Sequence, residues 1–256
     1  MLKCFNRASL FVLLNTLKLN AQKAKMIDLF NYERRESSVT HVGALDMGGD
    51  NPVRIQSMTT TNTNDTEASV AQAKRIIAAG GELVRLTTQG KREAENLKNI
   101  NAQLRAEGIT TPLCADVHFN ANVADVAALY AEKVRINPGN YVDPGRTFKV
   151  LEYTDEEYAK ELKRIEDRLT PFIQICKENH TAVRIGVNHG SLSDRIMSRY
   201  GDTPEGIVES CMEFLRIFKK HDFNDIVISI KASNTVVMVR SVRLLVAEME
   251  KEDMNY

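Results

Sequence analysis

Short aliphatic segments with a cation at the middle position recur along the chain. Val53-Arg54-Ile55, Val84-Arg85-Leu86, Val134-Arg135-Ile136 and Val183-Arg184-Ile185 share this form, and residues 226–231 end on a lysine. Alternate side chains of a strand face opposite sides, so each cation is directed away from the aliphatic pair that packs against helices. Stretches with helical periodicity separate these segments, which predicts parallel strands joined by helices.

Six strand–helix units follow from this pattern. Strands are predicted at residues 53–58, 83–87, 112–117, 133–137, 182–187 and 225–231. Helices are predicted at about residues 64–79, 92–107, 122–131, 154–178, 203–220 and 236–250. Asn64 with Glu67, and Thr154 with Glu157, have the spacing of capping boxes. A break in the fourth helix is expected at Pro171.

The six units predict an α/β fold of the (β/α)8 TIM-barrel type that is incomplete, because such a barrel has eight units in about 250 residues. An open six-stranded doubly wound sheet is the alternative. No G-x-G-x-x-G follows the first strand, which disfavours the dinucleotide-binding version of that sheet. A hairpin at residues 39–44 is expected to cover the barrel floor, and residues 141–153 form a long insertion after the fourth strand.

Composition narrows the class of protein. The 256 residues include 34 basic and 34 acidic side chains, so the formal net charge is zero, which argues against a nucleic-acid partner. The four cysteines form no C-x-x-C pair, which indicates a reducing, cytoplasmic location and predicts no metal site in this chain. No apolar run approaches the roughly 20 residues of a membrane span, so no membrane partner is expected.

The start of the chain differs from the rest. Residues 1–25 contain no acidic residue, and a largely apolar stretch follows Lys3 and Arg7. A signal or transit peptide has such features, although no clear cleavage site follows. We interpret residues 1–25 as a leader or mis-started extension and residues 26–256 as the barrel domain.

The predicted strands carry cations and amides toward their carboxyl ends, where barrel enzymes have their active sites. Arginine suits phosphate because its planar fork donates two parallel charge-assisted hydrogen bonds. Three arginines and a lysine around one mouth therefore predict a site for a ligand with two phosphoryl groups. Each arginine taken singly could equally pair with a carboxylate on a neighbouring strand, and Arg54 is expected to be structural. The cations of the predicted site are Arg85, Arg135, Arg184 and Lys231.

Asp116 and His118 are the candidate catalytic residues. They are two positions apart, so they share a strand face and could form an acid–base or orienting pair. The alternative is that Asp116 simply pairs with a nearby arginine. Cys114 faces the same side and is interpreted as a packing residue.

Five motifs in order closely resemble the barrel domain of the 4-hydroxy-3-methylbut-2-enyl diphosphate synthase family, in its larger form. They are Gln56-Ser57-Met58-Thr59, Ala115-Asp116-Val117-His118-Phe119, Arg135-Ile136-Asn137-Pro138-Gly139-Asn140, Val183-Arg184-Ile185-Gly186-Val187-Asn188 and Ser229-Ile230-Lys231. The resemblance implies an oxidoreductase of isoprenoid biosynthesis that reductively converts 2-C-methyl-D-erythritol 2,4-cyclodiphosphate to 4-hydroxy-3-methylbut-2-enyl diphosphate. It also implies a [4Fe–4S] cluster on a separate C-terminal domain, and ferredoxin or flavodoxin as electron donor.

The resemblance also implies roles for residues of this chain. It assigns diphosphate contacts to Arg85, Arg135, Arg184, Asn188 and Lys231, and it places Asp116, His118 and Asn137 in the pocket lining.

The chain departs from the family pattern. Strands seven and eight and every cluster-ligand motif are absent, so we expect an N-terminal fragment that does not turn over alone. A non-catalytic diphosphate-binding module, or another phosphate- or pterin-binding barrel enzyme, are the alternatives.

Overall fold

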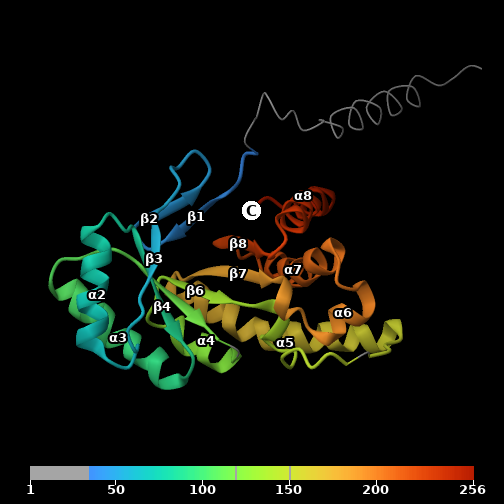
Figure 1. Ribbon diagram of the computed structural model, residues 1–256, viewed down its shortest axis with the longest axis horizontal. Coiled ribbons are helices and arrows are strands. Elements are labelled where there is room, and N and C mark those ends of the chain that lie inside the picture. Colours follow the sequence, from blue (N-terminus) through green and yellow to red (C-terminus); the bar gives the residue numbers. More distant parts are fainter. Residues whose placement is uncertain (1–34, 119, 150) are drawn as a thin grey trace, which may run out of the picture. The chain divides into compact units, whose positions relative to one another are not determined.

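The computed structural model describes residues 35–118, 120–149 and 151–256 (Figure 1). The chain divides into two units, Met1–Glu36 and Ser37–Tyr256, and every element below belongs to the second. The interpretation of residues 1–25 as a leader concerns residues outside the described ones.

Six parallel strands form one sheet in sequential order. A doubly wound sheet reverses its strand order at a switch point, whereas a (β/α) barrel does not. Strands β3 and β8 are the two edges and do not pair with each other in the described part of the chain. The strands are β3 (Gln56–Met58), β4 (Leu83–Thr88), β5 (Leu113–Val117), β6 (Lys133–Ile136), β7 (Ala182–Asn188) and β8 (Ile226–Lys231).

The helices pack on one face of this sheet. Val84 and Leu86 of β4 are fully buried in the same hydrophobic cluster as Leu97 of the following helix. Figure 1 shows the first four of these helices along one side of the strands. The helices are α2 (Thr66–Ala78), α3 (Lys91–Ala106), α4 (Ala121–Ala127), α5 (Asp155–Asn179), α6 (Asp194–Tyr200), α7 (Pro204–Lys220) and α8 (Thr235–Lys251), with single 3-10 turns η1 (Pro138–Asn140) and η2 (His189–Ser191).

The opposite face of the sheet is the lumen of an incomplete barrel. Its side chains at alternate positions are polar toward the carboxyl ends of the strands, and they include both apolar side chains and Lys133 nearer the amino ends. Leu83, Cys114 and Ala182 form a small separate cluster at the amino ends. The predicted α/β barrel class is thereby confirmed over the doubly wound alternative.

A β-hairpin closes the amino-terminal end of the lumen, as the sequence predicts. Strands β1 (Val39–Val42) and β2 (Leu45–Gly48) pair antiparallel around Gly43, whose φ is +58°. Val42 is fully buried against the cluster of Leu83, Cys114 and Ala182. The Thr40 hydroxyl donates a 2.8 Å hydrogen bond to the Ile226 carbonyl, which fixes the hairpin to the start of β8.

Several local predictions were wrong in detail. Asp65, not Asn64, caps α2, and its carboxylate accepts from the Ala68 backbone N–H at 3.0 Å. Helix α5 continues through Pro171 without a break, and the Thr170 hydroxyl donates to the Glu166 carbonyl in the turn before it. The first strand begins at Gln56 instead of residue 53. At this edge the Ile55 backbone N–H donates to the Glu82 carboxylate and not to a neighbouring strand. Helix α6 and both 3-10 turns were not predicted.

The irregular segment between η1 and α5 is tied to the barrel by buried charges. The Asp143 carboxylate accepts from Arg195 Nε at 3.1 Å, and Arg195 makes two 2.7 Å bonds to the Glu213 carboxylate. Asp194 accepts from the Thr147 and Phe148 backbone N–H groups, each at 3.0 Å. A buried charge is costly unless it is paired, so these contacts hold the segment against α6 and α7.

Candidate functional site

Asp116 is the centre of the predicted cationic cluster. Its carboxylate is 2 % exposed and accepts from Arg85 Nη2 at 2.5 Å and from Arg135 Nη1 at 3.4 Å. His118 Nε2 lies 3.1 Å from the same carboxylate. The structure thus combines both sequence interpretations, since Asp116 pairs with arginine and also contacts His118.

Strand register explains why these side chains meet. Thr87, Asp116, Arg135 and Arg184 are successive Cα partners across β4, β5, β6 and β7, so they form one layer of the lumen. Arg85 is one alternate position lower on β4 and reaches up to Asp116. Three of the four predicted cations, Arg85, Arg135 and Arg184, are therefore gathered on one face of the sheet.

Burial and mutual repulsion act on these guanidinium groups. Burial lowers the pKa of Arg135, and the Arg85 and Arg184 cations lower it further, whereas Asp116 opposes the shift. Burial also lowers the pKa of Arg184, again with a contribution from Arg85. Arginine remains charged in proteins, so the layer holds three positive charges beside one carboxylate. Such a cluster attracts anions.

Hydrogen-bond donors in the cluster are not all paired with residues that the structure describes. The Arg85 Nε group is buried and makes no hydrogen bond to the described residues. Arg184 donates from Nε to the Ser229 hydroxyl at 3.1 Å, and it forms no ion pair within the described part of the chain. Buried N–H groups are nearly always paired, so the Arg85 Nε group indicates a ligand that accepts hydrogen bonds.

Arg135 is held in place by a glycine on the next strand. Its Nη2 donates to the Gly186 carbonyl at 3.0 Å. A Cβ at position 186 would come within 2.4 Å of Arg135 Nε, so the missing side chain leaves the space that the guanidinium fills. Gly186 was not predicted as a site residue, although its place between Arg184 and Asn188 on the lumen face is the signal that identifies it.

Asn137 and Asn188 shape the turns that follow their strands. The Asn137 side chain accepts from the Gly139 N–H at 3.2 Å and donates to the Ser191 hydroxyl at 2.7 Å. Asn188 accepts from the Gly190 N–H at 3.3 Å. A Cβ on Gly139 would lie 1.9 Å from the Ser191 carbonyl oxygen, so η1 and η2 pack in direct backbone contact.

Lys231 ends β8 and is exposed, with Asn188 as its Cα partner on β7. Its side chain forms no hydrogen bond or ion pair with other residues that the structure describes. Arg54 is structural as predicted, since it bonds the Asp46 carbonyl at 2.7 Å and the Glu82 carboxylate at 3.0 Å. His189, on η2, pairs with Asp202.

The three cysteines that the structure describes do not fit an iron–sulfur cluster. Cys114, Cys176 and Cys211 are free and buried on β5, α5 and α7. Burial raises the pKa of all three thiols, to about 12 for Cys211, whereas iron is bound by thiolates. Among residues 35–118, 120–149 and 151–256, no three His, Cys, Asp or Glu side chains are grouped so that they could hold a metal ion.

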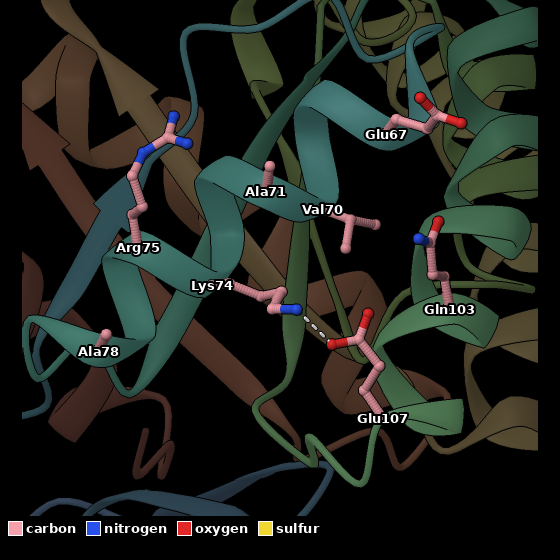
Figure 2. Close-up of a pocket in the computed structure, with 8 residues that line it drawn as sticks. All are labelled: Glu67, Val70, Ala71, Lys74, Arg75, Ala78, Gln103 and Glu107. Atoms are coloured by element: carbon pink, nitrogen blue, oxygen red, sulfur yellow. Dashed lines mark hydrogen bonds and ion pairs between the residues drawn. The ribbon is translucent and has the colours of Figure 1, made fainter.

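A groove on the outside of the barrel contains none of the predicted site residues. It has a volume of about 670 Å³ between α2 and α3 (Figure 2). Lys74 and Glu107 form an ion pair across it, and Arg75 points away from that pair. No helix in the described part of the chain is long and apolar enough to span a membrane.

The fold and the cluster define an incomplete (β/α) barrel with an arginine-rich lumen. The GcpE TIM-barrel domain family matches residues 37–253, and the chain belongs to this family.

Relatives with curated names agree with this assignment. The chain is 76 % identical over 230 residues to the 4-hydroxy-3-methylbut-2-en-1-yl diphosphate synthase (flavodoxin) of Phocaeicola vulgatus, with 90 % of this chain and 38 % of the relative covered. Proteins of the same name from Parabacteroides distasonis and Porphyromonas gingivalis are 66 % and 51 % identical, with 89 % and 90 % of this chain covered. These alignments cover 37 % and 39 % of the two relatives, so the chain spans well under half of their length.

Proposed function

We propose that this chain is the substrate-holding barrel of an enzyme that reductively converts 2-C-methyl-D-erythritol 2,4-cyclodiphosphate to 4-hydroxy-3-methylbut-2-enyl diphosphate. The observation that carries the proposal is the arginine layer around Asp116, in which the buried Arg85 Nε group has no acceptor among the described residues. The names of the relatives described above, which are 51–76 % identical to it, support the choice of substrate.

The arginines and Lys231 would hold the two phosphoryl groups. Arg135 and Arg184 are neighbours across β6 and β7, a spacing that suits adjacent phosphoryl oxygens. Asn188 and Lys231, paired across β7 and β8, extend the same rim. Lys231 is exposed and unpaired with the described residues, so it can turn toward a bound ligand without breaking a contact.

Asp116 and His118 would act together at the reacting end of the ligand. The carboxylate orients the imidazole through Nε2 and holds Arg85 and Arg135 in the lumen. An oriented histidine can deliver or accept a proton, which is the acid–base role predicted for the pair. Asn137 would contribute by fixing η1 against η2, because its side-chain nitrogen donates to Ser191 on η2 and its side-chain oxygen accepts from Gly139 on η1.

The electron-transfer part of the reaction would belong to residues other than those described here. We infer a [4Fe–4S] cluster for the complete protein, which would supply electrons for removal of the hydroxyl group. Flavodoxin is the donor in the relatives' names, and ferredoxin is the alternative. The separated free thiols fit a reducing cytoplasmic location.

Calorimetric titration of this chain with the cyclodiphosphate tests the proposal. Lys231→Met and Arg184→Met should each weaken binding, and loss of a charge-assisted hydrogen bond predicts about tenfold or more for Arg184. Arg92→Met, on the exposed surface of α3, is the matched control and should bind as the unaltered chain does. Equal affinity in all four proteins, or tighter binding of a pterin than of the cyclodiphosphate, would contradict the proposal.

A further inference from the structure

Lys133 is a buried lysine below the arginine layer, and the site described above gives it no role. It is 1 % exposed and is among the largest fully buried side chains of the described residues. Lysine is almost never fully buried unless it is paired. Its position two residues before Arg135 on β6 directs it into the same lumen, one layer nearer the floor.

The contacts of the Lys133 amine are neutral. Nζ lies 3.3 Å from the Gln56 side-chain oxygen and 3.9 Å from the Met47 sulfur. Within the described part of the chain it forms no ion pair with a carboxylate. A buried ammonium without a counter-charge is costly, so this environment favours the neutral amine.

The charged and titratable groups that face Lys133 come from three other strands and its own. Cys114 on β5, Arg85 on β4 and Arg184 on β7 act on it electrostatically, and Arg135 is the next lumen residue on β6 itself. Burial lowers the pKa of Lys133, and the Arg184 and Arg85 cations lower it further. A Cys114 thiolate would oppose this, but burial raises the pKa of Cys114 and so favours the neutral thiol.

We propose that Lys133 adjusts the charge of the site to its ligand by accepting a proton at Nζ when a ligand with two phosphoryl groups enters the arginine layer. The amine becomes an ammonium, and the proton comes from solvent. An anion in the layer above favours the charged form of the lysine. This inference rests on the proposed function, because it needs a doubly phosphorylated ligand at these arginines.

The sign of the pH dependence follows from this coupling. Lys133 keeps its proton to a higher pH in the complex than in the empty site. Binding therefore takes up protons at pH values between the pKa of Lys133 in the empty site and its pKa in the complex. Affinity then falls as pH rises through this window, by at most about tenfold per pH unit. Such a device favours ligands with two phosphoryl groups over ligands with one, because only the larger anionic charge offsets the cost of a buried ammonium.

Calorimetric titration with the cyclodiphosphate at several alkaline pH values below the ordinary pKa of lysine, in buffers of different ionisation enthalpy, measures the uptake directly. Each phosphorus of this ligand carries one strongly acidic oxygen, so the ligand itself does not titrate there. We expect uptake approaching one proton per site in the unaltered chain and none in Lys133→Met. Lys98→Met, on the exposed face of α3, is the matched control and should retain the uptake.

Lys133→Arg keeps the charge throughout this range, so it should bind without proton uptake, and it serves as a second variant if Lys133→Met does not fold. Binding without uptake by the unaltered chain, or uptake that persists in Lys133→Met, would overturn this inference alone. Absence of cyclodiphosphate binding by the unaltered chain would overturn the proposed function and this inference with it.

Discussion

Arg135 lies across Gly186, to whose carbonyl oxygen its Nη2 donates a 3.0 Å hydrogen bond. The guanidinium occupies the space that a side chain at position 186 would need, since a Cβ there would come within 2.4 Å of Nε. The position of one cation in the lumen is thus set by the absence of a side chain on the neighbouring strand. A substitution at Gly186 can therefore move the Arg135 charge without removing it.

Gly186→Ala should move Arg135 without unfolding the barrel, because the clashing group is the end of a flexible side chain. We expect weaker cyclodiphosphate binding by about tenfold, with a small change in thermal stability. Gly145→Ala is the matched control, since no atom lies within 4 Å of a Cβ built there. Unchanged affinity in Gly186→Ala would show that the position of Arg135 does not matter for binding.

Asp116→Asn should destabilise the empty chain, because Arg85 and Arg135 lose their shared carboxylate. Both arginines are partly exposed, so we expect a loss of about 1–3 kcal/mol in the free energy of unfolding. The cyclodiphosphate should recover part of this loss, since its phosphoryl oxygens can replace the carboxylate as acceptors. Denaturant unfolding with and without ligand measures both effects.

Asp155→Asn is the control for that experiment. Asp155 pairs with Arg199 at 2.7 Å but is 90 % exposed, and such surface pairs contribute about 0–1 kcal/mol. If Asp116→Asn unfolds no more easily than Asp155→Asn, the carboxylate is not what holds the two arginines.

Asp194 should make the stability of the chain depend on acid pH. Burial alone would raise the pKa of Asp194, but hydrogen bonds from the Thr147 side chain and the following backbone N–H groups leave it below its ordinary value. A carboxyl with a depressed folded-state pKa stabilises above its unfolded value of about 3.9, and this stability is lost as pH falls below it. Asp194→Asn should therefore be less stable than the unaltered chain at neutral pH. The difference in stability between the two should shrink below about pH 4.

Thermal unfolding across this pH range tests the role of Asp194. Asp50→Asn is the control, because Asp50 is exposed and makes no hydrogen bond to the described residues. If the stability difference between the unaltered chain and Asp194→Asn is the same at all pH values, ionisation of Asp194 does not hold the segment at residues 147–149.

Anaerobic reconstitution of this chain with iron and sulfide should yield no stable [4Fe–4S] absorption. The three described thiols are buried on different elements, and burial keeps them protonated. Electronic absorption and electron paramagnetic resonance spectra of the reconstituted chain check this. A stoichiometric cluster signal that resists desalting would contradict it.

Strand alternation is sufficient to predict the arginine layer. Arg85, Arg135 and Arg184 each lie between two aliphatic residues, and packing of the aliphatic pair against helices leaves only one direction for the cation. The same alternation places Lys133 in the lumen, but a sequence offers no reason to expect a lysine buried without a counter-charge.

Long-range contacts account for what sequence reasoning missed. The Asn137 amide is held by Ser191, and Gly139 is required by the Ser191 carbonyl, 52 positions further along the chain. Helix α6 depends on Arg195, whose partners Asp143 and Glu213 lie on either side of it in sequence. Contacts between residues so far apart in the sequence leave no periodic pattern in it, so they can be identified only from the folded structure.

A crystal structure of this chain with the cyclodiphosphate tests the central claim most directly. The account predicts phosphoryl oxygens within hydrogen-bonding distance of Arg85, Arg135 and Arg184, above the buried carboxylate of Asp116. A ligand bound elsewhere, such as in the groove between α2 and α3, with the three guanidinium groups unchanged, would contradict it.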